Sequence, residues 1–270
     1  MLVRTIPLIE PLTISAAPLT REAFAPFGDV VANPRPDARP SNTTPEAIAR
    51  GELPCGAVSA NQGTAIQYRS IASMRDLYDA APSRRVAGPR MTMFVCGART
   101  LVSGERGREA ADSVEIKVLE RHPFTSQTFI PLTADATKRY LVVVAPTLDA
   151  TSDEDGVLPA PAPEGTGLPG AGLPDVSRLA AFVATGEQAV TYAAGTWHAP
   201  MIALGPRDST IDFVVVQFAN DVPVEDCQEV ALEGGRIGEG EAEAEAEAEA
   251  VARIWVRVPE KAAERELAKL

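Results

Sequence analysis

Apolar residues occur along this chain in short runs, most of them bounded by turn residues, and this pattern predicts a fold built mainly from strands. Ser113–Leu119 alternates polar and apolar positions, as in a strand with one buried face. Tyr140–Ala145 and Ile211–Phe218 are almost continuously apolar, which predicts strands covered on both faces. The full set of predicted strands is Asp29–Ala32, Gln67–Ile71, Arg90–Cys96, Ser113–Glu120, Thr125–Pro131, Tyr140–Ala145, Gln188–Tyr192, Ala199–Ala203, Ile211–Phe218 and Arg253–Val258. Short strands at such intervals favour a closed barrel or a sandwich.

Only a few helices are predicted, and all of them are short. Leu19–Phe27 has Thr20 in position to cap its start, and Asp175–Thr185 has Asp175 or Ser177 as a cap and Gly186 as a stop. A single helical turn near Pro45–Arg50 and a charged helix at Glu260–Leu270 complete the set. The predicted fold class is therefore mainly β, with short flanking helices.

The composition is that of an ordinary globular protein, with 45% hydrophobic and 23% charged residues among 270. We expect one catalytic domain over residues 1–232, interrupted by a Pro- and Gly-rich insertion at 147–174. The composition of that insertion predicts a solvated excursion of the chain, that is, a surface loop between two strands that has no strand or helix of its own. Residues 233–250 form a low-complexity Glu-Ala segment, and residues 251–270 form a strand and helix extension.

The net charge of -12 excludes few functions, because six glutamates of the Glu-Ala segment account for half of it. There is no basic patch of the kind that binds nucleic acid. No window approaches the roughly 20 apolar residues of a membrane span. The three cysteines are widely spaced and form no disulfide framework, so we expect a cytoplasmic protein with reduced thiols.

The chain has only two histidines, and both lie among groups that could act in chemistry. Glu120 and His122 are two residues apart, so they point to one face of an extended strand. A turn over residues 123–126 brings Gln127 back beside them, and His198 follows the turn at Gly195. A carboxylate, imidazoles and an amide oxygen can together hold a divalent metal ion. The competing interpretation is that each histidine is an ordinary buried side chain.

These segments resemble known sequences. The spacing Glu120-x-His122-x4-Gln127 is similar to the first motif of the cupin barrels, His-x-His-x4-Glu, with two ligand types changed. Gly195-x2-His198 is similar to their second motif, without its proline. The segments themselves resemble the ureidoglycolate lyase family in five places: Leu19–Val31, Asn61–Tyr68, Glu120–Pro131, Gly186–Pro200 and Asp212–Val216.

The resemblance implies a cupin-type barrel, or jelly roll, acting as a homodimer in purine and allantoin breakdown. It implies that ureidoglycolate is split into glyoxylate and urea. The residues expected to act, directly or through a divalent metal ion, are Glu120, His122, Gln127 and His198. Those expected to bind substrate are Asn61, Gln62, Arg99 and Trp197.

Three questions stay open from the sequence. Any of Arg69, Arg90, Arg99 and Arg121 could bind the substrate carboxylate, although Arg121 points away from the Glu120 face of a regular strand. Another cupin amidohydrolase that releases ammonia from a ureido substrate would use the same residues. A non-catalytic cupin-like module that binds a small carboxylate is the more distant alternative.

Overall fold

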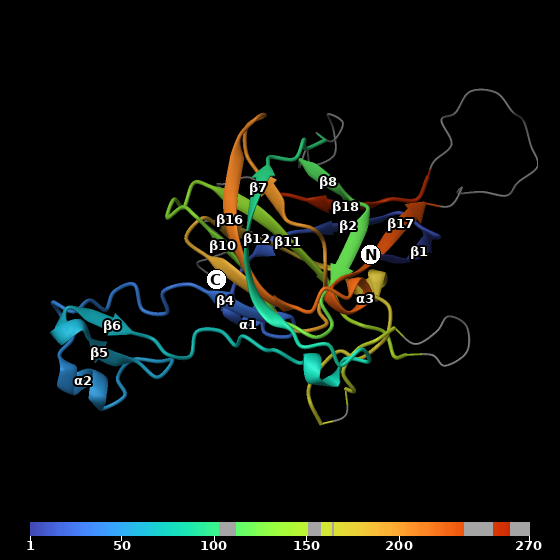
Figure 1. Cartoon of the computed structure of the whole chain (residues 1–270). Helices are drawn as coiled ribbons and strands as arrows, with labels where there is room; N and C mark the ends of the chain where they lie inside the picture. Colours follow the sequence, from blue (N-terminus) through green and yellow to red (C-terminus); the bar gives the residue numbers. More distant parts are fainter. Residues whose placement is uncertain (103–111, 151–157, 164, 235–250, 260–270) are drawn as a thin grey trace, which may run out of the picture.

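The computed structural model describes residues 1–102, 112–150, 158–163, 165–234 and 251–259, and over these residues the chain is mainly β, as predicted. Two large sheets face each other (Figure 1). The strands of the first, in spatial order, are β1 (Leu2–Leu8), β17 (Gln228–Gly234), β9 (Val118–Arg121), β14 (Trp197–His198), β11 (Arg139–Ala145), β12 (Ala180–Thr185) and β3 (Ala17–Pro18), while β15 (Ile202–Leu204) also pairs with β11.

The second sheet has five strands and closes the interior of the molecule. Its order is β4 (Gly28–Val31), β13 (Ala189–Tyr192), β10 (Gln127–Pro131), β16 (Thr210–Ala219) and β7 (Gly88–Gly97). Buried side chains from both sheets, including Phe129, Tyr140, Val142, Phe182 and Phe213, form one cluster between them. Both sheets lie within the predicted domain of residues 1–232, except for the last two residues of β17.

A third, smaller sheet covers the outer face of the first. It consists of β2 (Leu12–Ser15), β18 (Ile254–Arg257) and β8 (Ser113–Ile116). Ile254 and Val256 join a second core cluster with Leu141 and Val143 of β11. Strand β11 is therefore buried on both faces, as its continuous apolar run predicts.

The same prediction is wrong for Ile211–Phe218. In β16, Ile211, Phe213 and Val215 are buried, whereas Asp212 is exposed and Val214 is partly exposed. The run is apolar except for Asp212 and Gln217, but no described element covers its outer face. An apolar sequence alone cannot distinguish a face that packs inside the chain from a face left at the surface.

The helices are few and short. In α1 (Arg21–Phe24) the Thr20 side chain accepts a hydrogen bond from the Ala23 N–H, which confirms the predicted cap. Helix α2 (Pro45–Ala49) confirms the predicted turn. Helix α3 (Pro223–Asp226) and the 3₁₀ turns η1 (Asn61–Gly63), η2 (Tyr78–Ala80) and η3 (Val176–Arg178) were not predicted.

The predicted helix Asp175–Thr185 is wrong. Asp175 does cap a turn, because its side chain accepts from the Ser177 N–H, but only η3 follows before strand β12. This strand pairs antiparallel with β11, and its residues Ala181–Ala184 are buried. Phe182 faces one core cluster and Val183 faces the other. A run that is apolar on every side suits a doubly covered strand as well as a helix, and here pairing with β11 decided the outcome.

Several strand boundaries also differ from the predictions. Ser113–Glu120 divides at Lys117 into β8 and β9, which belong to different sheets. The segment Ala199–Ala203 is replaced by β14 and β15 on either side of Pro200. Of Gln67–Ile71, only Gln67 is in a strand, β6 (Ala65–Gln67), which pairs with β5 (Val58–Ala60). No strand was predicted at β1, β2, β3, β5 or β17.

The C-terminal strand is confirmed as β18, whereas most of the Glu-Ala segment and the helix Glu260–Leu270 lie outside the described residues. No helix in the described part of the chain is long and apolar enough to cross a membrane.

The described part of the 147–174 insertion has no strand or helix, as predicted, and residues 165–167 are exposed, but residues 168–174 are partly or fully buried. The guanidinium of Arg121 donates to the carbonyl oxygens of Gly170, Ala171 and Gly172 at 2.8–3.1 Å. Its Nε donates to Gln228 at 2.8 Å, and the group lies 4.5 Å from the centre of the Trp197 ring. A fully buried cation thus holds the insertion against the first sheet, because its charge must be satisfied by acceptors.

Candidate active site

Three of the predicted residues converge at one end of the interior. Strands β9 and β14 pair antiparallel with His198 opposite Glu120, and His122 follows β9. His198 Nε2 lies 3.7 Å from Glu120 Oε1, and the two imidazole rings are 5.7 Å apart. One ligand atom from each of Glu120, His122 and His198 lies within 4.8 Å of the other two. The predicted proximity of these three side chains is therefore confirmed, whereas their role in catalysis stays a prediction.

Backbone carbonyls fix the orientation of both imidazole rings. His122 Nδ1 is 2.6 Å from the Asp226 carbonyl oxygen, and His198 Nδ1 is 2.9 Å from that of Thr196. Because a carbonyl only accepts, each Nδ1 carries the hydrogen and each Nε2 presents a lone pair. Both Nε2 atoms are buried and have no hydrogen-bond partner.

Gln127 adds a third acceptor without a partner. Its amide nitrogen donates to Gln217 Oε1 at 2.7 Å, which leaves its own Oε1 buried and unpaired. Buried polar atoms nearly always find partners, so the two unpaired Nε2 atoms beside Glu120 indicate a ligand that supplies positive charge or hydrogen-bond donors. Two nitrogens, a carboxylate and an amide oxygen fit a divalent cation that accepts mixed nitrogen and oxygen ligands.

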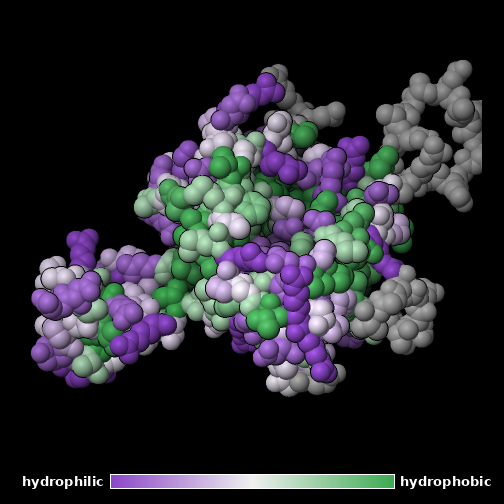
Figure 2. All heavy atoms as spheres, in the orientation of Figure 1, coloured by the Kyte–Doolittle hydropathy of each residue, from purple (hydrophilic) through white to green (hydrophobic). Residues whose placement is uncertain are grey.

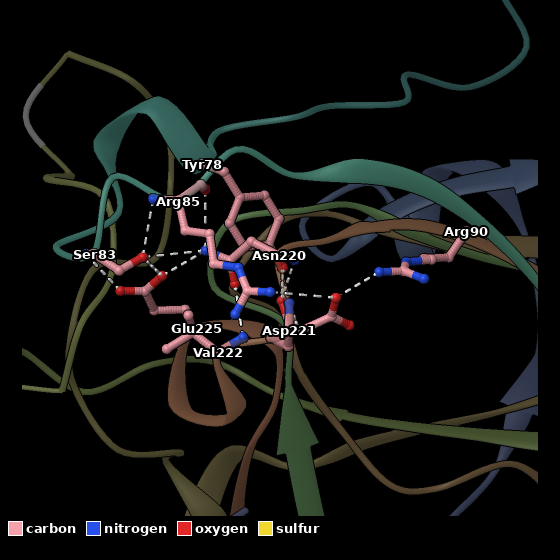
Figure 3. A network of polar contacts seen from close by, with 9 residues as sticks. Tyr78, Ser83, Arg85, Arg90, Asn220, Asp221, Val222 and Glu225 are labelled. Carbon is pink, nitrogen blue, oxygen red and sulfur yellow. Dashed lines mark hydrogen bonds and ion pairs between the residues drawn. The ribbon is translucent and has the colours of Figure 1, made fainter.

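The carbonyl that holds His122 is itself fixed by a polar network (Figure 3). The Asp226 carboxylate accepts hydrogen bonds from the Tyr78 hydroxyl at 2.6 Å and from the backbone N–H groups of Asn220 and Asp221. The neighbouring Glu225 carboxylate accepts from Ser83. Residues 78–83 are thereby tied to the loop that orients the histidine.

Burial sets the protonation of the site. It raises the pKa of Glu120 to about 7, and the nearby charge of Glu229 adds to this rise. Burial and the neighbouring His122 lower the pKa of His198 to about 3, and burial also lowers the pKa of His122. Near neutral pH both imidazoles are uncharged, while Glu120 is present in both its protonated and ionised forms. A carboxyl group of that kind can accept and return a proton.

Several site neighbours were not predicted. The Tyr192 ring stacks on His198 at 3.9 Å and is nearly parallel to it. Cys227 Sγ lies 4.0 Å from Glu120 Oε2, and Glu229 pairs with Glu120 across β17 and β9. Glu120, Cys227 and Glu229 form a second group of ligand atoms within 4.8 Å. Burial and Glu120 raise the pKa of Cys227 to about 12, so its thiol is neutral and a weaker ligand than the imidazoles.

The predicted substrate-binding residues do not lie beside this cluster. Asn61 and Gln62 are exposed on η1, in an arm formed by α2, β5 and β6 that projects from the barrel (Figure 1). Arg99 is exposed after the end of β7. Trp197 is fully buried on the opposite face of β14 from His198, where its indole N–H donates to the Gly172 carbonyl. The prediction that Trp197 contacts the site treated neighbours along a strand as if they shared a face.

Comparison with known proteins gives a consistent family. The family model described as ureidoglycolate lyase matches residues 11–237. The ureidoglycolate lyase of Schizosaccharomyces pombe is 34% identical over 226 residues, covering 83% of this chain and 94% of its own length. That of Saccharomyces cerevisiae is 32% identical, covering 84% and 97%. That of Burkholderia cepacia is 35% identical, covering 80% and 84%.

Proposed function

The chain belongs to the ureidoglycolate lyase family, and from this premise we propose that it eliminates urea from ureidoglycolate to give glyoxylate, a step of allantoin and purine breakdown. The observation that carries the proposal is the buried cluster of Glu120, His122 and His198 within a chain that matches the family over most of its length.

The reaction transfers one proton and breaks one bond. The substrate carbon carries a hydroxyl, a carboxylate and a urea nitrogen. As the hydroxyl loses its proton, its oxygen forms the carbon–oxygen double bond and the carbon–nitrogen bond breaks in the same step, with the electron pair of that bond going to nitrogen. Urea leaves after that nitrogen gains a proton, so the substrate and the products have the same atoms.

Glu120 is suited to the proton transfer because its pKa of about 7 allows it to accept the hydroxyl proton and return it to nitrogen. The neutral Nε2 atoms of His122 and His198 and the Oε1 of Gln127 are acceptors, so they would accept from the O–H and N–H groups of the substrate, or hold its oxygens through a divalent cation. The exclusion of water by Tyr192 and the buried surroundings strengthens these interactions.

The experiment that tests the function measures urea, ammonia and glyoxylate together from ureidoglycolate, against the spontaneous rate. Urea equal to glyoxylate, with no ammonia, supports the lyase. Ammonia in place of urea assigns a hydrolase on the same barrel. The absence of any product above background supports the non-catalytic module instead.

We further propose that Glu120, His122, Gln127 and His198 hold a divalent metal ion, which would lower the pKa of a bound hydroxyl and orient the substrate. Adding Mn²⁺ or Zn²⁺ to chelator-treated protein is then expected to raise the unfolding temperature by about 5 °C, measured calorimetrically with the ion at about 100 times its Kd.

His122→Ala is expected to abolish this metal-induced rise, because it removes one nitrogen ligand. Glu229→Gln is the matched control, since Glu229 neighbours Glu120 but lies outside the group with two histidines. An equal rise in the wild type and in His122→Ala would locate the bound ion elsewhere.

For the assembly we propose a homodimer formed through the outer face of the second sheet. This apolar sheet face consists of Met91, Met93 and Val95 on β7, with exposures of 75%, 59% and 64%, and Ile130 on β10. Val214 and Val216 lie between them in register, and Figure 2 shows the apolar area over β7 and β16. Strand β7 is also a ten-residue edge strand, which a second copy related by a twofold axis can pair with or cover.

Met93→Asp is expected to shift the sedimenting mass from dimer to monomer, because it places a charge at the centre of the apolar sheet face. Met74→Asp is the matched control, since Met74 is 49% exposed but lies outside that face. An unchanged dimer in the Met93 variant would contradict this interface.

We also propose a cupin-type barrel in a cytoplasmic protein. The two opposed sheets with ligands at one end of their shared interior support the first statement. The second rests on the three cysteines, all of which are free thiols.

A further inference from the structure

Four polar side chains form a row across the second sheet, and the row leads from the candidate site to its rim. Tyr192 pairs with Gln127 between β13 and β10. Thr128 of β10 pairs with Val216 of β16, and the two strands are antiparallel, so Gln127 and Gln217 are opposite each other one position further. Their side-chain amides are hydrogen-bonded at 2.7 Å. Gln217 in turn pairs with Arg90 on β7.

All four side chains lie on the interior face. Along β16, Phe213 and Val215 are buried in the cluster between the sheets, and Gln217 continues that alternation. Residues directly opposite each other in an antiparallel pair point to the same side, so Arg90 lies on that side of the sheet as well, at its exposed edge. Neighbouring strands are about 4.8 Å apart, which puts the Arg90 backbone about 10 Å from that of Gln127. A long side chain can span most of that gap and still leave room for a small substrate.

The present partner of Arg90 is a weak one. Its guanidinium contacts Asp221 at 2.7 Å, and both side chains are about half exposed. Exposed ion pairs contribute little net stability, so an incoming carboxylate can replace Asp221. Asp221 belongs to the loop whose Asp226 carbonyl orients His122, and the link from Arg90 through Asp221 is visible in Figure 3.

The other candidate arginines lie elsewhere. Arg69 follows β6 in the projecting arm, and Arg99 follows the far end of β7 from Arg90. Arg121 lies on the opposite face of β9 from Glu120, where its guanidinium donates hydrogen bonds to the carbonyl oxygens of the insertion. Among the four arginines considered from the sequence, only Arg90 lies in the row that includes Gln127.

We propose that Arg90 binds the substrate carboxylate and thereby selects 2-hydroxy acids over their neutral analogues. The planar guanidinium binds a carboxylate through two parallel hydrogen bonds. The substrate then lies between Arg90 and the Glu120–His122–His198 cluster, with its hydroxyl toward the cluster. This assignment rests on the proposed lyase function for the identity of the reaction.

The test compares ureidoglycolate with its carboxamide analogue, in which the charge is removed and the shape is kept. The wild type is expected to prefer the carboxylate by about 100-fold in kcat/KM, and Arg90→Gln to lose most of that preference, chiefly through KM. Arg90→Lys is expected to recover part of it. Arg99→Gln, an exposed arginine on the same edge of the sheet, is the matched control and keeps the full preference. An Arg90→Gln enzyme that still prefers the carboxylate by 100-fold would overturn the assignment.

Equilibrium binding of glycolate, a simple 2-hydroxy carboxylate, separates this proposal from the lyase itself. If the wild type releases no urea but Arg90→Gln weakens glycolate binding at least 10-fold, the function fails and the role of Arg90 stands. If the wild type releases urea while Arg90→Gln binds glycolate as tightly as before, the lyase stands and the role of Arg90 fails.

Discussion

Replacement of His198 by alanine is expected to lower kcat/KM for urea release by about 10²–10⁴-fold. His198 Nε2 is buried, faces Glu120 and has no hydrogen-bond partner, so its lone pair is available to a ligand. The imidazole is also held from two sides, by the Thr196 carbonyl at Nδ1 and by the Tyr192 ring. These two contacts fix the direction in which Nε2 points. The loss is measured by urea and glyoxylate release under saturating and subsaturating substrate.

The variant must fold for the result to bear on catalysis. Removal of the ring leaves a small gap against Tyr192, so a comparable gap is made by Phe182→Leu, which alters the same interior cluster. Both variants are expected to lose a similar amount of free energy of unfolding, but only His198→Ala is expected to lose activity. Near-normal turnover in His198→Ala would remove this residue from the proposed mechanism.

The local part of the site could be predicted from the sequence because its geometry is set by short-range rules. Alternation along a strand puts Glu120 and His122 on one face, and a turn brings Gln127 back. Alternation also excludes Arg121 and Trp197, the immediate neighbours of Glu120 and His198. The structure agrees with this rule, because Trp197 lies on the outer face of the first sheet with Arg121.

The parts that could not be predicted depend on which strands are neighbours and in what register. Gln217 meets Gln127, and Arg90 meets Gln217, only because β10, β16 and β7 are adjacent in that order. The Asp226 carbonyl reaches His122 from a residue 104 positions away. The same dependence explains the error at residues 175–185, whose apolar run fits either a helix or a doubly covered strand until β11 is known to lie beside it.

Glu120→Gln is expected to inactivate the enzyme and yet to stabilise the metal-free protein above neutral pH. Burial raises the pKa of Glu120 from 4.5 to about 7 in the folded state. Between those values the folded chain retains a proton that the unfolded chain has released, so the stability of the wild type falls as pH rises through this range. The full difference corresponds to about 3 kcal/mol at pH 8. Glutamine has similar shape and no titration, and it therefore avoids this loss.

The measurement is the free energy of unfolding in denaturant, with chelator present, at pH 4, 5.5, 6.5 and 8. The lowered pKa of His198 acts in the opposite direction in both proteins, since stability falls as pH drops below 6.5, so the comparison between pH 6.5 and 8 reports Glu120 most directly. The variant should gain about 1–3 kcal/mol relative to the wild type between pH 4 and pH 8. Glu229→Gln, a more exposed carboxylate opposite Glu120, should gain less. A Glu120→Gln protein that loses stability relative to the wild type as pH rises would mean that the folded state favours the ionised carboxylate. A gain in the stability of the variant relative to the wild type would instead show that the ionised Glu120 carboxylate destabilises the folded state, as expected for a residue retained for catalysis.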